Sequence, residues 1–245
     1  MTINTKTLAA IDIGTNAIRL FISNVEEYPT ETLFKKIAFL RVPIRLGEDV
    51  FTTGEIGQQK RKRLCETMQG FSYIMSAFNV ESYKAYATCA MREARNGKSV
   101  AEQIQKECDL NIEIISGTKE AETIFAGGMN EVVDDDKTYL YVDVGGGSTE
   151  VIVYSKSVKV EACSFPLGTV RMLNDAVDKE EMKHFKKWLK NITEKYTPDA
   201  IIGSGGNINK IHKLLNKKER ERITYQELDI LYEYMKSFNL EERER

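Results

Sequence analysis

The stretch YLYVDVGGGSTEVIVY, residues 139–154, predicts a β-strand, a tight turn and a second β-strand. Its turn holds three successive glycines, which lose much conformational freedom on folding and are expected where backbone turns sharply or approaches another group closely. Asp143 ends the first strand and Glu150 begins the second. Bare amide groups in such a turn can point together at a phosphate, which favours a phosphate cradle beside a divalent cation. A hairpin turn with two solvated acids is the alternative that this stretch leaves open.

A similar pattern opens the chain. The segments AIDIGT (residues 10–15) and YVDVGG (residues 141–146) share the order apolar, apolar, Asp, apolar, Gly, and each lies between two β runs. Because the segments are about half a chain apart, they indicate a duplicated domain rather than a short solenoid repeat. Chance similarity between two common hairpins is the alternative. Two such domains facing each other would direct both turns into one cleft.

β runs and helical periodicity alternate along the chain, which predicts an α/β fold with parallel strand pairing after an initial antiparallel meander. We expect two domains, residues 1–132 and 133–245, with the boundary between Gly127-Gly128 and the acidic run Asp134-Asp135-Asp136. The expected strands are 8–13, 17–22, 33–40, 82–87, 111–115, 139–143, 150–154, 158–164 and 199–202. The expected helices are 53–78, 100–108, 119–130, 179–196, 208–215 and one that begins near 224.

Composition excludes several classes of protein. The chain has 245 residues, of which 42% are hydrophobic, and its net charge of −2 gives no overall signature of DNA binding. Four scattered cysteines without a C-x-x-C pair, together with only two histidines, argue against a zinc site and a disulfide framework. A leader and a long apolar run are also lacking, so we expect a soluble cytoplasmic protein with no membrane partner.

Three further segments could contribute to a site. Asp12 precedes Gly14-Thr15-Asn16 at the first turn, and Gly203-Ser204-Gly205-Gly206 lies between a predicted strand and a predicted helix. A glycine turn of that second kind places an anion at a helix N-terminus. Residues 115–122 predict a helix start with Glu120 in its first turn. An acid there gains about 0.3–1 kcal/mol from the helix dipole without any catalytic role, so spacing alone favours the structural explanation for Glu120.

Other phosphate and catalytic motifs are excluded. Gly97-Lys98-Ser99 resembles the end of a P-loop, but Arg92 occupies the position that requires a glycine. The chain has no G-x-S-x-G elbow and no G-x-G-x-x-G after its first strand, which disfavours a serine hydrolase and a dinucleotide oxidoreductase.

In their order along the chain, these motifs resemble those of the exopolyphosphatase and guanosine pentaphosphate phosphohydrolase family, within the actin-like ATPase superfamily. The resemblance covers nearly the whole chain and implies two actin-like (ribonuclease H-like) domains, with mixed sheets flanked by helices, that face each other across a cleft. The motifs that carry it are residues 11–16 with Arg19 and Leu20, residues 87–96, residues 114–117 with Glu120 and Ala121, residues 142–150, residues 166–168 and residues 203–206.

The resemblance also implies an activity, namely hydrolysis of the terminal phosphate of inorganic polyphosphate or of the 5′ γ-phosphate of guanosine pentaphosphate. It implies Mg²⁺ or another divalent cation, a homodimer and a role in the stringent response. Glu120 matches the family's catalytic glutamate, which activates the attacking water, and Arg92 matches an arginine that contacts phosphate. The implied metal ligands are Asp143, Glu150 and Asp12. The implied phosphate-binding residues are Gly14, Thr15, Asn16, Gly145, Gly146, Gly147, Ser148, Thr149, Gly205 and Gly206.

Two other functions fit the same fold. The first is a non-catalytic sensor that binds guanosine tetraphosphate, guanosine pentaphosphate or polyphosphate through the same glycine turns, and the need for Glu120 separates it from the enzyme. The second is a sugar-kinase-like or chaperone-like ATPase, which the arginine-containing segment near Arg92 disfavours.

The sequence departs from the family pattern at three places. Lys119 stands where members commonly have a second glutamate, so we expect positive charge beside the base that helps to hold a polyanion. Asn207 replaces the usual threonine after the last glycine pair. Family members normally continue with a further segment that completes the second domain, so we expect a shortened form with an incomplete second domain and impaired closure of the cleft.

Overall fold

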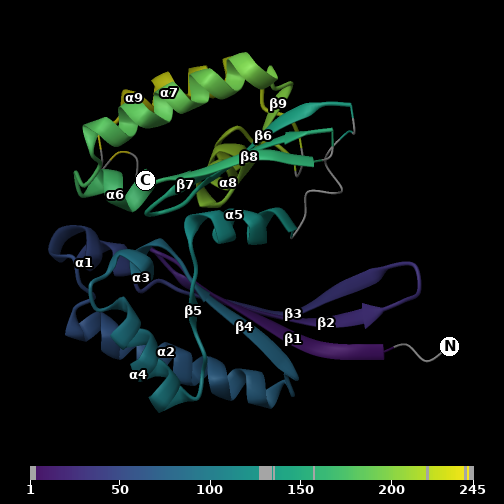
Figure 1. Cartoon of the computed structure of the whole chain (residues 1–245), viewed down its shortest axis with the longest axis vertical. Coiled ribbons are helices and arrows are strands. Elements are labelled where there is room, and N and C mark those ends of the chain that lie inside the picture. The colour runs from purple at the N-terminus through teal and green to yellow at the C-terminus, as the bar shows by residue number, and fades with distance from the viewer. Residues whose placement is uncertain are drawn as a thin grey trace.

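The computed structural model describes residues 4–126, 134, 136–156, 158–218, 221–239 and 242. The chain forms two halves, each built on a mixed β-sheet that carries helices (Figure 1). This arrangement confirms the predicted α/β class with two mixed sheets flanked by helices.

The sheet of the first half has the strand order β3-β2-β1-β4-β5. The first three strands form the predicted antiparallel meander, and β4 and β5 then pair parallel, β4 with β1 and β5 with β4. The strands are β1 (Asn4–Ile13), β2 (Ile18–Glu27), β3 (Thr32–Val42), β4 (Ser82–Ala87) and β5 (Glu113–Ile114).

The helices of the first half differ from the prediction at two places. The single helix expected over residues 53–78 is wrong, because the chain forms α1 (Leu46–Thr53) and α2 (Gln58–Ala77) with a break between them. Gly54 causes the break, since its φ of 78° is left-handed and its N–H bonds to the Val50 carbonyl as a C-cap. The short α3 (Cys89–Glu93) was not predicted, whereas α4 (Gly97–Cys108) was expected.

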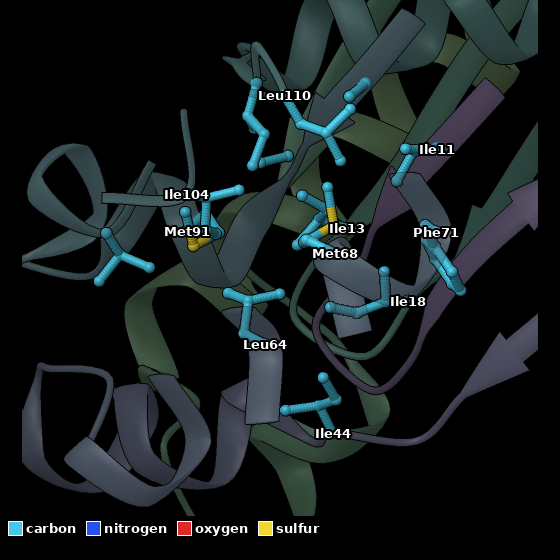
Figure 2. Close-up of a cluster of buried hydrophobic side chains, with 14 of the residues drawn as sticks. Ile11, Ile13, Ile18, Ile44, Leu64, Met68, Phe71, Met91, Ile104 and Leu110 are labelled. Atoms are coloured by element: carbon cyan, nitrogen blue, oxygen red, sulfur yellow. The ribbon is translucent and has the colours of Figure 1, made fainter. Parts of the chain in front are cut away.

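A hydrophobic core fixes α2 and α4 against this sheet. Figure 2 shows side chains of the strands, including Ile11, Ile13 and Ile18, together with Leu64, Met68 and Phe71 of α2. The apolar α2 positions recur every three or four residues and are buried, as predicted for one helix face. The C-terminal end of β1, where Asp12 lies, is therefore held in place by this core.

The sheet of the second half has the strand order β8-β7-β6-β9, with antiparallel pairs except for β6 and β9, which run parallel. Its strands are β6 (Thr138–Val144), β7 (Thr149–Ser155), β8 (Val158–Phe165) and β9 (Ala200–Ser204). Its described helices are α6 (Thr169–Leu173), α7 (Lys179–Tyr196), α8 (Gly206–Leu214) and α9 (Tyr225–Lys236). The ends of these elements were predicted to within two residues, except that only the start of α9 was predicted and α6 was not predicted at all.

The two halves repeat one hairpin in detail. In the first half the Gly14 N–H bonds to the Ala17 carbonyl at 3.2 Å, and in the second the Gly145 N–H bonds to the Ser148 carbonyl at 2.9 Å. Asp12 and Asp143 occupy matching positions two residues before their turns. This shared hairpin and the shared order of strands support the predicted duplication.

Helix α5 (Gly117–Ala126) follows β5 in the chain but packs on the second sheet. Its Ala121 is buried beside Tyr141 of β6 and Ile152 of β7, and Figure 1 shows the helix between the two sheets. The predicted boundary at residues 132 and 133, like Gly127-Gly128, lies outside the described residues and stays a prediction.

The four cysteines are all free, as expected. Within the described part of the chain, none of the helices is both long enough and apolar enough to cross a membrane.

Candidate functional site

Two acids face each other across the second hairpin. Asp143 of β6 is directly opposite Glu150 of β7, and Glu150 is only 2% exposed. Like charges in this arrangement destabilise a sheet, and a buried carboxylate is costly. Burial raises the pKa of both acids, although hydroxyl groups from Ser164 and Ser204 donate to them, at 2.9 Å to Glu150 and 3.3 Å to Asp143. A placement that costs stability marks these acids as functional candidates.

The matching acid of the first hairpin has a different partner. The Arg19 guanidinium donates to the Asp12 carboxylate at 2.5 Å, from the opposite position on β2. Burial raises the pKa of Asp12, and Arg19 offsets only part of this rise. The negative charge of Asp12 in turn raises the pKa of Asp143, so the two hairpins bring their acids near each other.

Glu120 lies at the start of α5 and faces Arg92 of α3. The Arg92 Nη1 donates to Glu120 Oε2 at 3.3 Å and to the Ile115 carbonyl at 2.9 Å. Burial raises the pKa of Glu120 to about 7, and the nearby charge of Glu150 adds to this rise, while Arg92 opposes it. An acid placed only to interact with the helix dipole would have a lowered pKa. A pKa near neutrality suits a general base.

The glycine turn of the second hairpin is fixed from one side by α6. The Gly145 carbonyl accepts from the Thr169 N–H at 3.0 Å, and the Gly146 carbonyl accepts from the Val170 N–H at 2.8 Å. Because the N–H and C=O of a trans peptide point in opposite directions, the next amides in the chain point away from α6. The turn therefore presents successive N–H groups on its other side, as a phosphate cradle requires.

Close packing between the halves is a second reason for these glycines. A Cβ at Gly146 would lie 3.1 Å from the Thr15 Cβ, and one at Gly147 would lie 2.4 Å from the Cys89 sulfur and 2.8 Å from the Phe51 ring. Neither glycine has a positive φ. The sequence suggested a sharp turn or a bound ligand as the reason for the three glycines. The structure adds a further reason for two of them, because side chains at Gly146 and Gly147 would collide with residues of the first half.

The third predicted turn reaches the same acids. Gly205 is the N-cap of α8, with φ 91°, and a Cβ there would lie 2.5 Å from Asp143 Oδ1. Asn207 in the first turn of α8 donates to the Val144 carbonyl at 3.2 Å, so the residue that departs from the family pattern supports the end of β6. The three glycine turns and four acids thus gather where the two sheets face each other.

Comparison with known proteins identifies the family. The chain matches the sequence model of the Ppx/GppA phosphatase family over residues 22–245. The chain belongs to this family. The membership confirms the resemblance and the actin-like architecture that it implied.

Individual Ppx/GppA relatives are similar over different shares of their length. The chain is 32% identical to the bifunctional 3-dehydroquinate synthase/phosphatase of Fusobacterium nucleatum over 168 residues, which are 67% of this chain and 25% of that protein. It is 28% identical to Exopolyphosphatase 2 of Mycobacterium tuberculosis over 170 residues, 67% of this chain and 53% of that protein. The crystal structure of an exopolyphosphatase from Cytophaga hutchinsonii has a TM-score of 0.76 and 25% identity, over 90% of this chain and 73% of that chain. The chain thus spans about a quarter and about half of these two curated relatives.

The remaining predicted site residues of this Ppx/GppA chain lie at the two hairpin turns. Thr15 is buried against Gly146, whereas Asn16 is exposed. The Ser148 hydroxyl bonds to Glu150, and the Thr149 hydroxyl donates to the Leu167 carbonyl at 2.6 Å. The proton of the Thr149 hydroxyl is therefore already used within the protein. Phosphate binding by these residues stays a prediction.

Lys119, which was expected to add positive charge beside the base, is paired with an acid of the first half. Its Nζ forms an ion pair with Glu113 and lies 5.3 Å from the centre of the Tyr86 ring. Sequence reasoning also missed Ser164. Ser164 is opposite Glu150 in the β7–β8 pair. Only a correct prediction of the register between these two strands could have placed the two residues together.

The donors fit a divalent cation that binds together with its substrate. Among the described residues, no three His, Cys, Asp or Glu side chains are grouped closely enough to hold a metal ion by themselves. Mg²⁺ commonly takes one or two carboxylates, several waters and substrate phosphates as ligands. Burial raises the pKa of Asp143 and of Glu150, and a neighbouring acid adds to each rise, Asp12 at Asp143 and Asp143 at Glu150. A cation would neutralise this negative charge. The three acids stay the predicted ligands.

The raised pKa of Glu120 predicts a pH-dependent stability. The folded protein holds the Glu120 proton up to pH about 7, whereas the unfolded chain releases it near the ordinary value of 4.5. The stabilisation is therefore complete below pH 4.5 and is lost as pH rises to 7, by about 2–3 kcal/mol relative to a Glu120→Gln variant. Urea unfolding of both proteins between pH 5 and 8 measures the difference. A constant difference across this range would contradict the raised pKa.

Proposed function

We propose that this Ppx/GppA family member hydrolyses the terminal phosphate of inorganic polyphosphate, and that the 5′ γ-phosphate of guanosine pentaphosphate is an alternative substrate. The observation that carries the proposal is the half-buried Glu120 carboxylate, with a pKa of about 7, which accepts a hydrogen bond from Arg92 and lies near Glu150 and Asp12 of the two hairpins. The names of the exopolyphosphatase relatives add support for polyphosphate. Cytoplasmic location and a homodimeric state remain predictions.

In the proposed reaction, the amides of the two hairpin turns bind the oxygens of the terminal phosphate, and Arg92 contributes positive charge to them. Glu120 accepts a proton from a water molecule whose oxygen forms a bond to phosphorus. The bridging P–O bond breaks in line with this attack, and a chain shorter by one phosphate leaves. A divalent cation bound by Asp143, Glu150 and Asp12 would supply further neutralisation of charge on the phosphate oxygens.

A sensor would not need this carboxylate. Binding of a polyanion is favoured by positive charge and amide donors, whereas a half-buried carboxylate near the binding site opposes it. The position of Glu120 therefore favours catalysis over the non-catalytic alternative.

The test is phosphate release from long-chain polyphosphate, tripolyphosphate, guanosine pentaphosphate and ATP, each with and without Mg²⁺. We expect Mg²⁺-dependent release from polyphosphate or guanosine pentaphosphate, with ATP much slower. Tight binding of guanosine pentaphosphate or polyphosphate, measured by calorimetry, without any release of phosphate would identify a sensor instead.

A further inference from the structure

Arg171 of α6 joins the glycine turn to the first half of the molecule. The residue is 8% exposed, its Nε donates to the Gly147 carbonyl at 2.9 Å, and its guanidinium lies 4.1 Å from the centre of the Phe51 ring in α1. Its Nη2 donates to both Glu93 carboxylate oxygens, at 2.6 and 2.7 Å. One side chain therefore contacts the glycine turn of the second half and two helices of the first.

Glu93 stands next to Arg92 at the end of α3. Arg92 points to the Glu120 carboxylate, and Glu93 points to Arg171. The short helix thus has two neighbouring charged side chains, one bound to the proposed base and one bound, through Arg171, to the turn proposed to hold phosphate. Any shift of the turn relative to α3 must break the contacts of Arg171.

Stability alone is a poor explanation for this ion pair. The Arg171 side chain is 10% exposed, and burying a charge costs free energy that an ion pair often only balances. Such a pair does impose a defined geometry, because the guanidinium binds a carboxylate and a carbonyl in fixed directions. The structure therefore suggests that the pair sets the spacing between the two halves of the site.

We propose that Arg171 and Glu93 are positioning residues for the reaction. Their ion pair, called the clasp below, holds the 145–147 turn at a fixed position relative to Arg92 and Glu120. This inference rests on the proposed function for its catalytic consequence. Its structural content, that the clasp orders the turn, does not depend on any substrate. Neither residue touches the reacting atoms, so each acts through its neighbours.

The test compares Glu93→Gln, Arg171→Lys and the double variant with wild type. Glutamine keeps the size of Glu93 without its charge, and lysine keeps the charge of Arg171 without the planar fork. We expect kcat on polyphosphate to fall about 10-fold in each single variant, with KM changed by less than about 3-fold, because misplaced groups slow chemistry more than binding. The double variant should be no slower than the slower single variant, since both changes break one contact.

Glu55→Gln is the matched control. Glu55 pairs with Arg95 within the first half, where both side chains are exposed, at 52% and 66%, so kcat should stay unchanged. Wild-type kcat in both single variants, or losses that multiply in the double variant, would overturn the catalytic role.

Hydrogen exchange of the peptide that covers residues 143–150 provides a readout without substrate. We expect exchange there to be several-fold faster in Glu93→Gln than in wild type and unchanged in Glu55→Gln, because the turn loses an anchor. If wild type releases no phosphate from any substrate, the proposed function fails, and faster exchange in Glu93→Gln still supports the clasp. Identical exchange in all three proteins would overturn the clasp itself.

Discussion

Replacing Glu120 with glutamine is expected to lower kcat for phosphate release by about 10²–10⁴-fold while the substrate still binds. Glutamine has nearly the same shape and can accept the hydrogen bond that Arg92 donates at 3.3 Å to the carboxylate. It cannot accept a proton from water. Binding should therefore persist, and loss of the negative charge should strengthen it. Turnover measured by phosphate release and binding measured by calorimetry on the same preparation test both parts.

Glu122→Gln is the matched control for this variant. Glu122 lies two residues further along α5, where its carboxylate is half-exposed and pairs with Lys159 at 2.7 Å. The same chemical change on the same helix should leave kcat within about twofold of wild type, because an exposed ion pair contributes little. Equal turnover by wild type and Glu120→Gln would show that Glu120 is not the base.

Replacing Gly205 with alanine is expected to lower the free energy of unfolding by about 3–5 kcal/mol and to reduce turnover, since two penalties combine. The backbone angles of Gly205, φ 91° and ψ −174°, belong to a region that only glycine adopts readily. A Cβ would also lie 2.5 Å from Asp143 Oδ1, which would displace a proposed metal ligand. Urea unfolding and phosphate release measure the two effects.

Gly206→Ala provides a comparison at the next residue. A Cβ at Gly206 meets no atom within 4 Å, and the residue begins α8 with helical backbone. Stability should therefore stay within about 0.5 kcal/mol of wild type, as for most surface changes. Similar losses in both variants would mean that flexibility of the loop, rather than the contact with Asp143, matters at this position.

Repeating local patterns made much of the fold predictable. Alternating apolar residues, glycine turns and the repeated Asp-x-Gly segment indicated both hairpins, and helical periodicity indicated α2 and α7. The acids at Asp12 and Asp143 were found because each ends an apolar strand before a glycine turn. That Asp12 and Asp143 lie close to each other could be predicted only from the hypothesis that the two domains face each other.

Features set by tertiary contacts could not be predicted. The short helix α6 depends on hydrogen bonds from its first amides to the carbonyls of Gly145 and Gly146, which are more than twenty residues earlier. The raised pKa of Glu120 depends on burial and on Glu150, and neither is visible in the segment around it. The ion pair of Lys119 was not predicted either, because its partner, Glu113, lies on the preceding strand.

Glu120 belongs mechanically to the second half, because α5 packs on β7 and β8, whereas Arg92 is part of α3 in the first half. Rotation of one half away from the other would therefore separate the base from its only described cationic hydrogen-bond partner and admit water to both. Closing would restore the hydrogen bond from Arg92, which lowers the proton affinity of Glu120. It would also exclude that water, which raises the proton affinity. The pKa of Glu120 thus depends on the angle between the halves, so a change in that angle would change the pKa of the proposed base.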